Sequence, residues 1–293
     1  MRTVAGLALA LLVALGLLPA ARAADGKINL VAAENFYGDV AAQIGGGRVA
    51  VSSIMNNPDQ DPHLFETTPA VARNLANAQI VVFNGADYDP WMETLLKASP
   101  RPGRKEIIAA ELTHRKAGDN PHLWYDPVTM PAVARAIAAA LSAVDLAHRQ
   151  DYAARLNAFL ASLAPLNARI AAIRGKFAGM PVTASEPVFG LMAGALGLTV
   201  RNVRFQLSIM NDTEPSARDV AGFERDLKEH KVRVMFYNKQ ASDKTVQRLV
   251  DIARAAKVPV VAVTETKPPG MSYQDWMLGQ LRDTEKALAG PGS

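Results

Sequence analysis

Two of the five histidines in this chain share an unusual local sequence. His63 lies in PHLF and His122 in PHLW, so each follows a proline and precedes an apolar and then an aromatic residue. An imidazole nitrogen is a ligand for divalent first-row metals, and the repeated context favours a shared role as metal ligands. The simpler interpretation of each is a turn residue. The other histidines lie in charged or helical contexts, and we expect them at the surface: His114, His148 and His230.

Two carboxylates end predicted strands in the second half of the chain. Glu186 is the last residue but one of PVTASEP, and Glu265 ends VPVVAVTE. In open α/β sheets, ligands bind outside the carboxyl ends of strands, where the two PH histidines are also expected. Two histidines with two carboxylates suit zinc or manganese, whereas the lack of cysteine excludes thiolate ligands and thiolate catalysis. Spacing alone does not bring the four residues together, and a solvated strand-end acid remains the alternative for each glutamate.

Short apolar strands alternate with helical segments in both halves of the chain. The first half runs from KINLVAAE to KEIIAAE, and the second from MPVTASEP through LTVRNVRF to VPVVAVTE. This alternation indicates parallel sheets covered by helices on both faces. Between the halves, residues 131–177 are rich in Ala, Leu and Arg and have helical spacing. We therefore predict an α/β fold of two Rossmann-like lobes joined by a long rigid helix, with the metal site in the cleft between them.

The start of the chain has the pattern of a cleaved secretory signal peptide. Residues 1–23 combine Arg2, a long apolar run and the small-x-small site Ala21-Arg22-Ala23. No later apolar run approaches the roughly 20 residues of a transmembrane helix, so we expect a soluble exported protein. The remaining predicted domains are an N-terminal lobe, a linking helix and a C-terminal lobe, at 24–140, 141–177 and 178–293.

Charge and cysteine content restrict the partners and the compartment. The chain has 32 basic and 28 acidic residues, and loss of Arg2 and Arg22 with the signal peptide leaves 30 against 28. A balance of +2 is too small to indicate a nucleic-acid partner. With no cysteine, the processed chain has no N-terminal thiol for lipid attachment. We therefore expect a monomer in the periplasm that is not lipid-anchored.

Four segments together resemble the periplasmic metal-binding (solute-binding) proteins of zinc and manganese ABC transporters. They are DPHLFETTP, NPHLWYDP, TASEPVFGLMAGALGL and VPVVAVTET, in the expected order over nearly the whole chain. The resemblance implies a protein that is not an enzyme, that captures zinc or manganese, and that delivers the ion to an ABC permease in the inner membrane. It also implies His63 and His122 as ligands. Glu186 matches a ligand that is glutamate in manganese-type members, and Glu265 is nearest to the fourth ligand.

The chain departs from this family pattern in three places. It lacks the long His- and acid-rich loop of many zinc-specific members, and Asn238 replaces a glutamate that often follows a strand of the second half. The fourth ligand is usually aspartate, whereas Glu265 is one methylene longer. Asp212 or Glu214 therefore remains an alternative fourth ligand.

Two acids close to the histidines could support the site. Asp126 either accepts a hydrogen bond from a ligand imidazole or starts the turn before Pro127. Glu66 precedes Thr67-Thr68-Pro69, where a helix is expected to begin, and acids favour that end of a helix. We expect Glu66 to be a surface or capping acid.

Two other functions fit parts of the pattern. A metallohydrolase could use the same His and Glu residues to activate water, but the sequence has no HExxH helix and no Gly-x-Ser-x-Gly elbow. A binding protein for an organic ligand such as a siderophore needs aromatic or arginine groups at its cleft. Aromatic residues make up only 6% of the chain, although Arg201 and Arg204 keep this alternative open.

Overall fold

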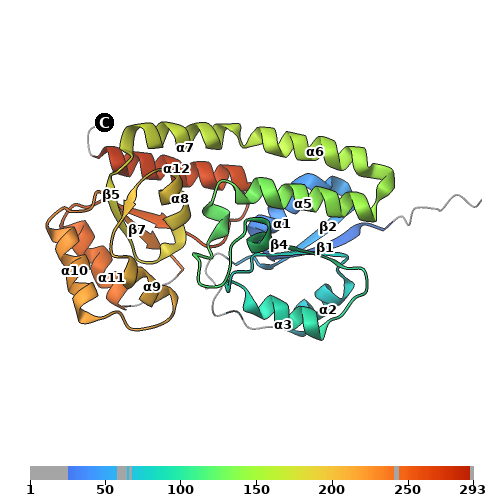
Figure 1. Cartoon of the computed structure of the whole chain (residues 1–293), viewed down its shortest axis with the longest axis horizontal. Helices are drawn as coiled ribbons and strands as arrows, with labels where there is room; N and C mark the ends of the chain where they lie inside the picture. The colour runs from blue at the N-terminus through green and yellow to red at the C-terminus, as the bar shows by residue number, and fades with distance from the viewer. Residues whose placement is uncertain (1–25, 58–64, 66–67, 241–243, 291–293) are drawn as a thin grey trace, which may run out of the picture.

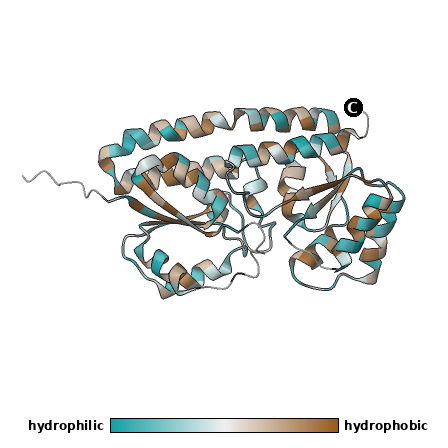
Figure 2. Cartoon of the chain, turned by 180° about the vertical axis from the view of Figure 1, so that it is seen from behind, coloured by the Kyte–Doolittle hydropathy of each residue, from teal (hydrophilic) through white to brown (hydrophobic). Residues whose placement is uncertain are grey.

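The structure, a computed structural model, describes residues 26–57, 65, 68–240 and 244–290. His63 and Glu66 therefore lie outside the described residues. Two α/β lobes lie side by side, and helices run along one side of both (Figure 1). Figure 2 shows that the strands of the sheets are largely hydrophobic, while the helices carry both hydrophobic and hydrophilic residues. The predicted class, α/β with two parallel-sheet lobes, is confirmed.

The N-terminal lobe is a parallel sheet of strand order β2-β1-β3-β4 between two layers of helices. Its elements are β1 (Ile28–Glu34), α1 (Asn35–Gly45), η1 (Gly46–Arg48), β2 (Val49–Met55), α2 (Pro69–Asn77), β3 (Ile80–Phe83), α3 (Pro90–Ala98), β4 (Lys105–Ile108), α4 (Ala109–Leu112), η3 (Leu123–Tyr125) and α5 (Thr129–Val144). Successive strand residues point to opposite faces. Leu30 and Val82 pack in the core with α1 and α5, whereas Val31 and Val81 pack with α2 and α3. Both faces are buried, which explains the continuous apolar runs.

The C-terminal lobe repeats this plan with strand order β6-β5-β7-β8. Its elements are β5 (Pro181–Ala184), η5 (Pro187–Phe189), α8 (Gly190–Ala195), β6 (Thr199–Val200), α9 (Val203–Met210), α10 (Ala217–Lys228), β7 (Met235–Asn238), α11 (Lys244–Ala255), β8 (Val260–Val263) and α12 (Tyr273–Ala289). The LTVRNVRF segment supplies only a two-residue strand, because Asn202 takes a left-handed conformation (φ 58°) and α9 begins at the next residue.

The linking segment consists of η4 (Leu146–His148), α6 (Arg149–Ser162) and α7 (Ala164–Phe177), and α6 and α7 extend along both lobes (Figure 1). Leu163 interrupts them, and Pro165 lies in the first turn of α7, where a proline costs no helical hydrogen bond. By length and composition alone, one described helical stretch, Leu146–Phe177, is long and apolar enough to cross a membrane, although polar and charged residues interrupt it. The Ala/Leu-rich composition accounts for this, and here the stretch packs on α5, α1 and α12.

A second connection between the lobes was not predicted. Helix α12 belongs to the C-terminal lobe, but it packs along α7 and its N-terminus reaches α1 of the other lobe. The backbone N–H of Tyr273 donates to Asp39 Oδ2 over 2.9 Å. Just before α12, Asn35 and Lys267 exchange two hydrogen bonds, of 2.7 Å and 2.8 Å. The lobes are therefore held by α12 as well as by the linking helices.

Candidate metal site

Three neighbouring strands of the C-terminal lobe place polar residues at their carboxyl ends. Glu186 lies just beyond β5, Asn238 ends β7, and Glu265 lies just beyond β8. Because β7 lies between β5 and β8 in the sheet, the asparagine lies between the two carboxylates. All three side chains are buried, with exposed fractions of 6%, 1% and 1%. This is the edge of the sheet at which ligands bind in open α/β folds.

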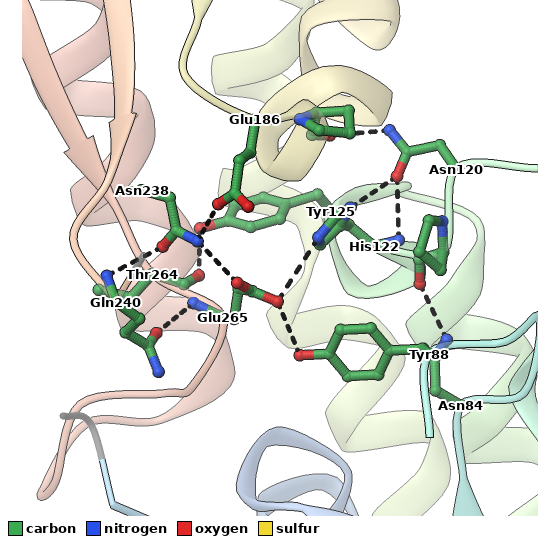
Figure 3. Close-up of polar contacts among 12 residues, drawn as sticks. Asn84, Tyr88, Asn120, His122, Tyr125, Glu186, Asn238, Gln240, Thr264 and Glu265 are labelled. Carbon is green, nitrogen blue, oxygen red and sulfur yellow. Dashed lines mark hydrogen bonds and ion pairs between the residues drawn. The ribbon is translucent and has the colours of Figure 1, made fainter. Parts of the chain in front are cut away.

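Asn238 bridges the two candidate carboxylate ligands (Figure 3). Its Nδ2 donates to Oε2 of Glu186 and, over 2.7 Å, to Oε1 of Glu265. Its Oδ1 accepts from the backbone N–H of Gln240 over 3.1 Å, which fixes the direction in which the amide points. The Gln240 side chain in turn accepts from the backbone N–H groups of Glu265 (2.6 Å) and Thr266 (3.2 Å). Polar contacts therefore hold the Glu265 segment against the end of β7.

His122 reaches the same place from the N-terminal lobe. It lies in the loop just before η3, with 1% of its surface exposed, and its Nε2 is 3.5 Å from Oε2 of Glu265. Its Nδ1 is 2.8 Å from Oδ1 of Asn120, which also accepts from the His122 backbone N–H over 3.0 Å. A carbonyl oxygen only accepts, so Nδ1 carries a proton and Nε2 is the nitrogen that can bind a metal.

Tyr88 is the second residue of the N-terminal lobe that contacts Glu265. Its hydroxyl donates to Oε2 of Glu265 over 3.0 Å. Burial, and then the negative charges of Glu265 and Glu34, raise the pKa of Tyr88 well above its usual value, so the hydroxyl keeps its proton and acts as a donor. The rings of Tyr88 and Trp124 stand edge-on to His122, with centroids 5.9 Å and 5.4 Å away. Aromatic packing therefore fixes the imidazole on two sides.

A buried polar network supports the His122 loop from within the N-terminal lobe. Nδ2 of Asn84 donates to the carbonyl of Pro121 over 2.8 Å, and Oδ1 accepts from the Tyr37 hydroxyl over 2.7 Å. The Asp89 carboxylate accepts from the backbone N–H groups of Asn84 and Gly85, each over 2.7 Å. Because Pro121 immediately precedes His122, this network positions the candidate ligand His122 through its backbone.

Glu34 ends β1 next to this network and is completely buried. No N–H or O–H group of the described residues donates to its carboxyl oxygens, but Asp89 is within hydrogen-bonding reach. Two carboxyl groups in contact must share a proton. Burial, followed by the charge of Asp89, raises the pKa of Glu34 well above its usual range. Burial also raises the pKa of Asp89 to about 6, against the lowering effect of its hydrogen bonds.

The structure brings together three of the four predicted ligands, directly or through Asn238: His122, Glu186 and Glu265. The fourth, His63, falls outside the described residues. Within the described ranges, no three His, Asp or Glu side chains form a complete metal-holding group on their own. The alternative carboxylates Asp212 and Glu214 are exposed between α9 and α10, whereas Glu265 is buried beside the imidazole.

Of the two roles left open for Asp126, the structure shows the turn and not the contact with the imidazole. Asp126 forms an ion pair with Arg115 (3.1 Å) and accepts from the backbone N–H of Val128 (3.3 Å), so it starts the turn before α5. Asn120 contacts the His122 ring instead, and its Nδ2 also donates to Pro187 of the other lobe over 2.8 Å. Sequence reasoning missed this role, although Asn120 belongs to the NPHLW motif itself.

Comparison with known proteins identifies the family. A family model described as zinc-uptake complex component A, periplasmic, matches residues 30–287. The chain belongs to this family. Its members are substrate-binding proteins of zinc and manganese ABC transporters and not enzymes, so the family-level resemblance is confirmed.

Individual relatives of the zinc-uptake component A family cover nearly the whole chain. The metal ABC transporter substrate-binding lipoprotein ScbA of Streptococcus cristatus is 24% identical, over 90% of this chain and 89% of its own length. The manganese ABC transporter substrate-binding lipoprotein PsaA of Streptococcus mitis is 23% identical, over 90% of each. The structure of the periplasmic zinc-binding protein TroA of Treponema pallidum superposes with a TM-score of 0.77 at 20% identity, over 90% of this chain and 99% of TroA.

These names correct the expected localisation. We predicted a periplasmic protein that is not lipid-anchored, whereas ScbA and PsaA, which match along 90% of the chain, are named lipoproteins. The prediction of an unanchored protein is therefore contradicted. The absence of cysteine excludes lipid attachment through a cysteine thiol in this chain. It does not establish whether the protein is anchored to a membrane in another way.

Proposed function

We propose that this chain binds one divalent transition metal, zinc or manganese, between its lobes and delivers it to the permease of an ABC importer. The observation that carries the proposal is the approach of His122 Nε2 to Glu265 Oε2, 3.5 Å apart and both buried. One residue comes from each lobe. His63 and Glu186 complete the proposed ligand set.

The charges of the site support a cation as cargo. Glu186 and Glu265 are buried and point at the same asparagine amide, which carries no charge. Ionised carboxylates in a buried place are costly unless a positive charge lies close to them. Two neutral imidazoles and two carboxylates would balance a doubly charged ion, and all four groups are ordinary ligands of zinc.

The rival functions receive less support. Four protein ligands would fill the coordination sphere of zinc, whereas a hydrolytic site keeps one position open for water, so we propose that the chain is not an enzyme. The arginines that kept an organic ligand open are engaged elsewhere. Arg201 binds Asp226 through two hydrogen bonds of 2.8 Å and 3.0 Å, and Arg204 lies 3.5 Å from Asp219.

The partners follow from this function. The proposed partners are the metal ion and the transporter permease. A nucleic-acid partner is not proposed, because the formal charge of the whole chain is only +4. We propose that the monomer is the binding unit, because both halves of the ligand set come from one chain.

Metal affinity of single histidine variants tests the proposal. Zinc and manganese affinities are measured by competition with a chelator for the parent, His63→Ala and His122→Ala. Loss of a metal ligand should weaken binding by orders of magnitude in both variants. His114→Asn is the matched control, because His114 is exposed and its φ of 55° is tolerated by asparagine. Parent-like affinity in both alanine variants would overturn the proposal.

A further inference from the structure

Asn238 uses one oxygen of each candidate carboxylate ligand. Its Nδ2 donates to Oε2 of Glu186 and to Oε1 of Glu265 (Figure 3). A rotation of the Asn238 amide by 180° would break these hydrogen bonds. Oδ1, which accepts from the Gln240 N–H, would then face two carboxylate oxygens. Both N–H groups of the amide are therefore directed at the two carboxylates.

The other oxygen of Glu265 faces the N-terminal lobe. Oε2 lies 3.5 Å from Nε2 of His122 and accepts from the Tyr88 hydroxyl over 3.0 Å. An ion that binds His122 and Glu265 together would therefore meet Oε2, while Oε1 is turned toward Asn238. Chelation by both oxygens would require the carboxylate to give up its hydrogen bond to the amide. The same restriction applies to Glu186, whose Oε2 is the oxygen held.

We propose that Asn238 is a specificity-determining residue: it restricts Glu186 and Glu265 to one oxygen each and so favours a four-coordinate metal over a six-coordinate one. The inference rests on the proposed function. Two imidazoles and two single carboxylate oxygens make four ligands, the number that zinc takes in closed protein sites. Manganese prefers octahedral sites that are rich in oxygen ligands. Carboxylates provide more of these ligands when each binds the ion through both of its oxygens.

Asn238 acts without charge and without touching the ion. A carboxylate in its place would repel Glu186 and Glu265, whereas the amide donates to both. Its position at the end of the strand between β5 and β8 makes it the residue best placed to reach both acids. Its own backbone N–H donates to Ser185 Oγ over 3.0 Å, so its main chain is fixed as well.

The test compares the parent with Asn238→Leu, which keeps the branched shape and the number of heavy atoms of the side chain but has no donor. Zinc and manganese affinities are measured by chelator competition, and the visible absorption of the Co²⁺-loaded protein reports coordination number. We expect the zinc-to-manganese affinity ratio to fall roughly tenfold or more, the scale of losses at residues that orient ligands. The strong Co²⁺ absorption of a four-coordinate site should weaken as the carboxylates begin to chelate.

A second variant and a control keep the test decisive. Asn238→Asp retains the acceptor for the Gln240 N–H but loses both donors, so the ratio should fall here too, even if the leucine variant folds poorly. Asn167→Leu, on the exposed face of α7, should leave ratio and spectrum unchanged. An unchanged ratio and spectrum in both Asn238 variants, or an equal loss of both metals, would overturn the inference. A parent protein that binds neither metal would instead overturn the proposed function and this inference with it.

Discussion

Oδ1 of Asn120 lies 2.8 Å from Nδ1 of His122, while Nδ2 of Asn120 donates to the Pro187 carbonyl of the opposite lobe. One side chain therefore sets the tautomer of a candidate ligand and also connects the two lobes. The contact leaves Nε2 of His122 directed at Glu265, 3.5 Å away. Residues that orient a metal-binding imidazole in this way contribute strongly to affinity although they do not touch the metal.

Replacement of Asn120 should weaken metal binding without abolishing it. Asn120→Ala removes the acceptor at Nδ1, and the expected loss of zinc affinity is about 10–100-fold. Asn120→Asp keeps an acceptor at the same position and should bind more tightly than the alanine variant. Titration against a chromogenic chelator measures both. Equal affinities of the parent and Asn120→Ala would show that this contact does not act on the site.

Metal affinity should depend on pH in the direction set by the ligands. Neutral imidazole and ionised carboxylate are the forms that bind, so protons compete with the metal. Zinc affinity should fall as the pH is lowered from about 7 to about 5, through the reference histidine pKa of about 6.5. Chelator competition at several pH values measures the slope. A flat profile in the parent would contradict two histidine ligands.

The buried pair Glu34 and Asp89 should make the protein less stable as the pH rises. A carboxylate in an ordinary ion pair, whose pKa is lowered, has the opposite effect. Both pKa values are raised in the folded protein, that of Asp89 to about 6. The folded state therefore holds protons that the unfolded chain releases near pH 4. This contribution to the free energy of unfolding is fully present below about pH 4 and is lost as the pH rises through about 6 and beyond.

Glu34→Gln tests that dependence because glutamine cannot ionise yet can still donate to Asp89. In the presence of a chelator, the melting temperature of the parent should fall relative to this variant between pH 5 and pH 8, by at least about 2 °C. Glu111→Gln, at an exposed position, serves as the control and should follow the parent at every pH. A constant difference between parent and Glu34→Gln would mean that Glu34 does not retain its proton.

Glu186→His should change which metal is preferred. A nitrogen ligand in place of an oxygen makes the site softer and less anionic, which favours zinc over manganese. The zinc-to-manganese affinity ratio should therefore rise, and parallel titrations with the two ions measure it. If the ratio is unchanged, Glu186 is not a ligand.

The sequence predicted the fold well because hydrophobic periodicity is a local signal. Buried runs such as IVVF and the helical stretch from 131 to 177 identify their own secondary structure, and their alternation implies parallel sheets. The prediction was poorest for LTVRNVRF, which forms a strand of only two residues before the left-handed Asn202. The reach of α12 across both lobes was not predictable, because periodicity shows that a helix is amphipathic and not what it packs on.

The site was predictable to the extent that its residues follow strands. Each candidate ligand was chosen from a strand end or a PH motif, and His122 and Glu265 do come within 3.5 Å. In the sequence, Asn238 differs from its surroundings only as a departure from a family pattern. Its bridging role depends on β7 lying between β5 and β8, and the order of strands in a sheet cannot be read from their order in the sequence.

The most direct test of the central claim is a crystal structure of the zinc-loaded protein with anomalous data collected at the zinc absorption edge. We expect one strong anomalous peak between the lobes, about 2.0–2.1 Å from one ring nitrogen each of His63 and His122. Single oxygens of Glu186 and Glu265 should lie about 2.0–2.2 Å from it. A peak elsewhere, or one at this place that lacks His122 or Glu265 among its ligands, would contradict the claim.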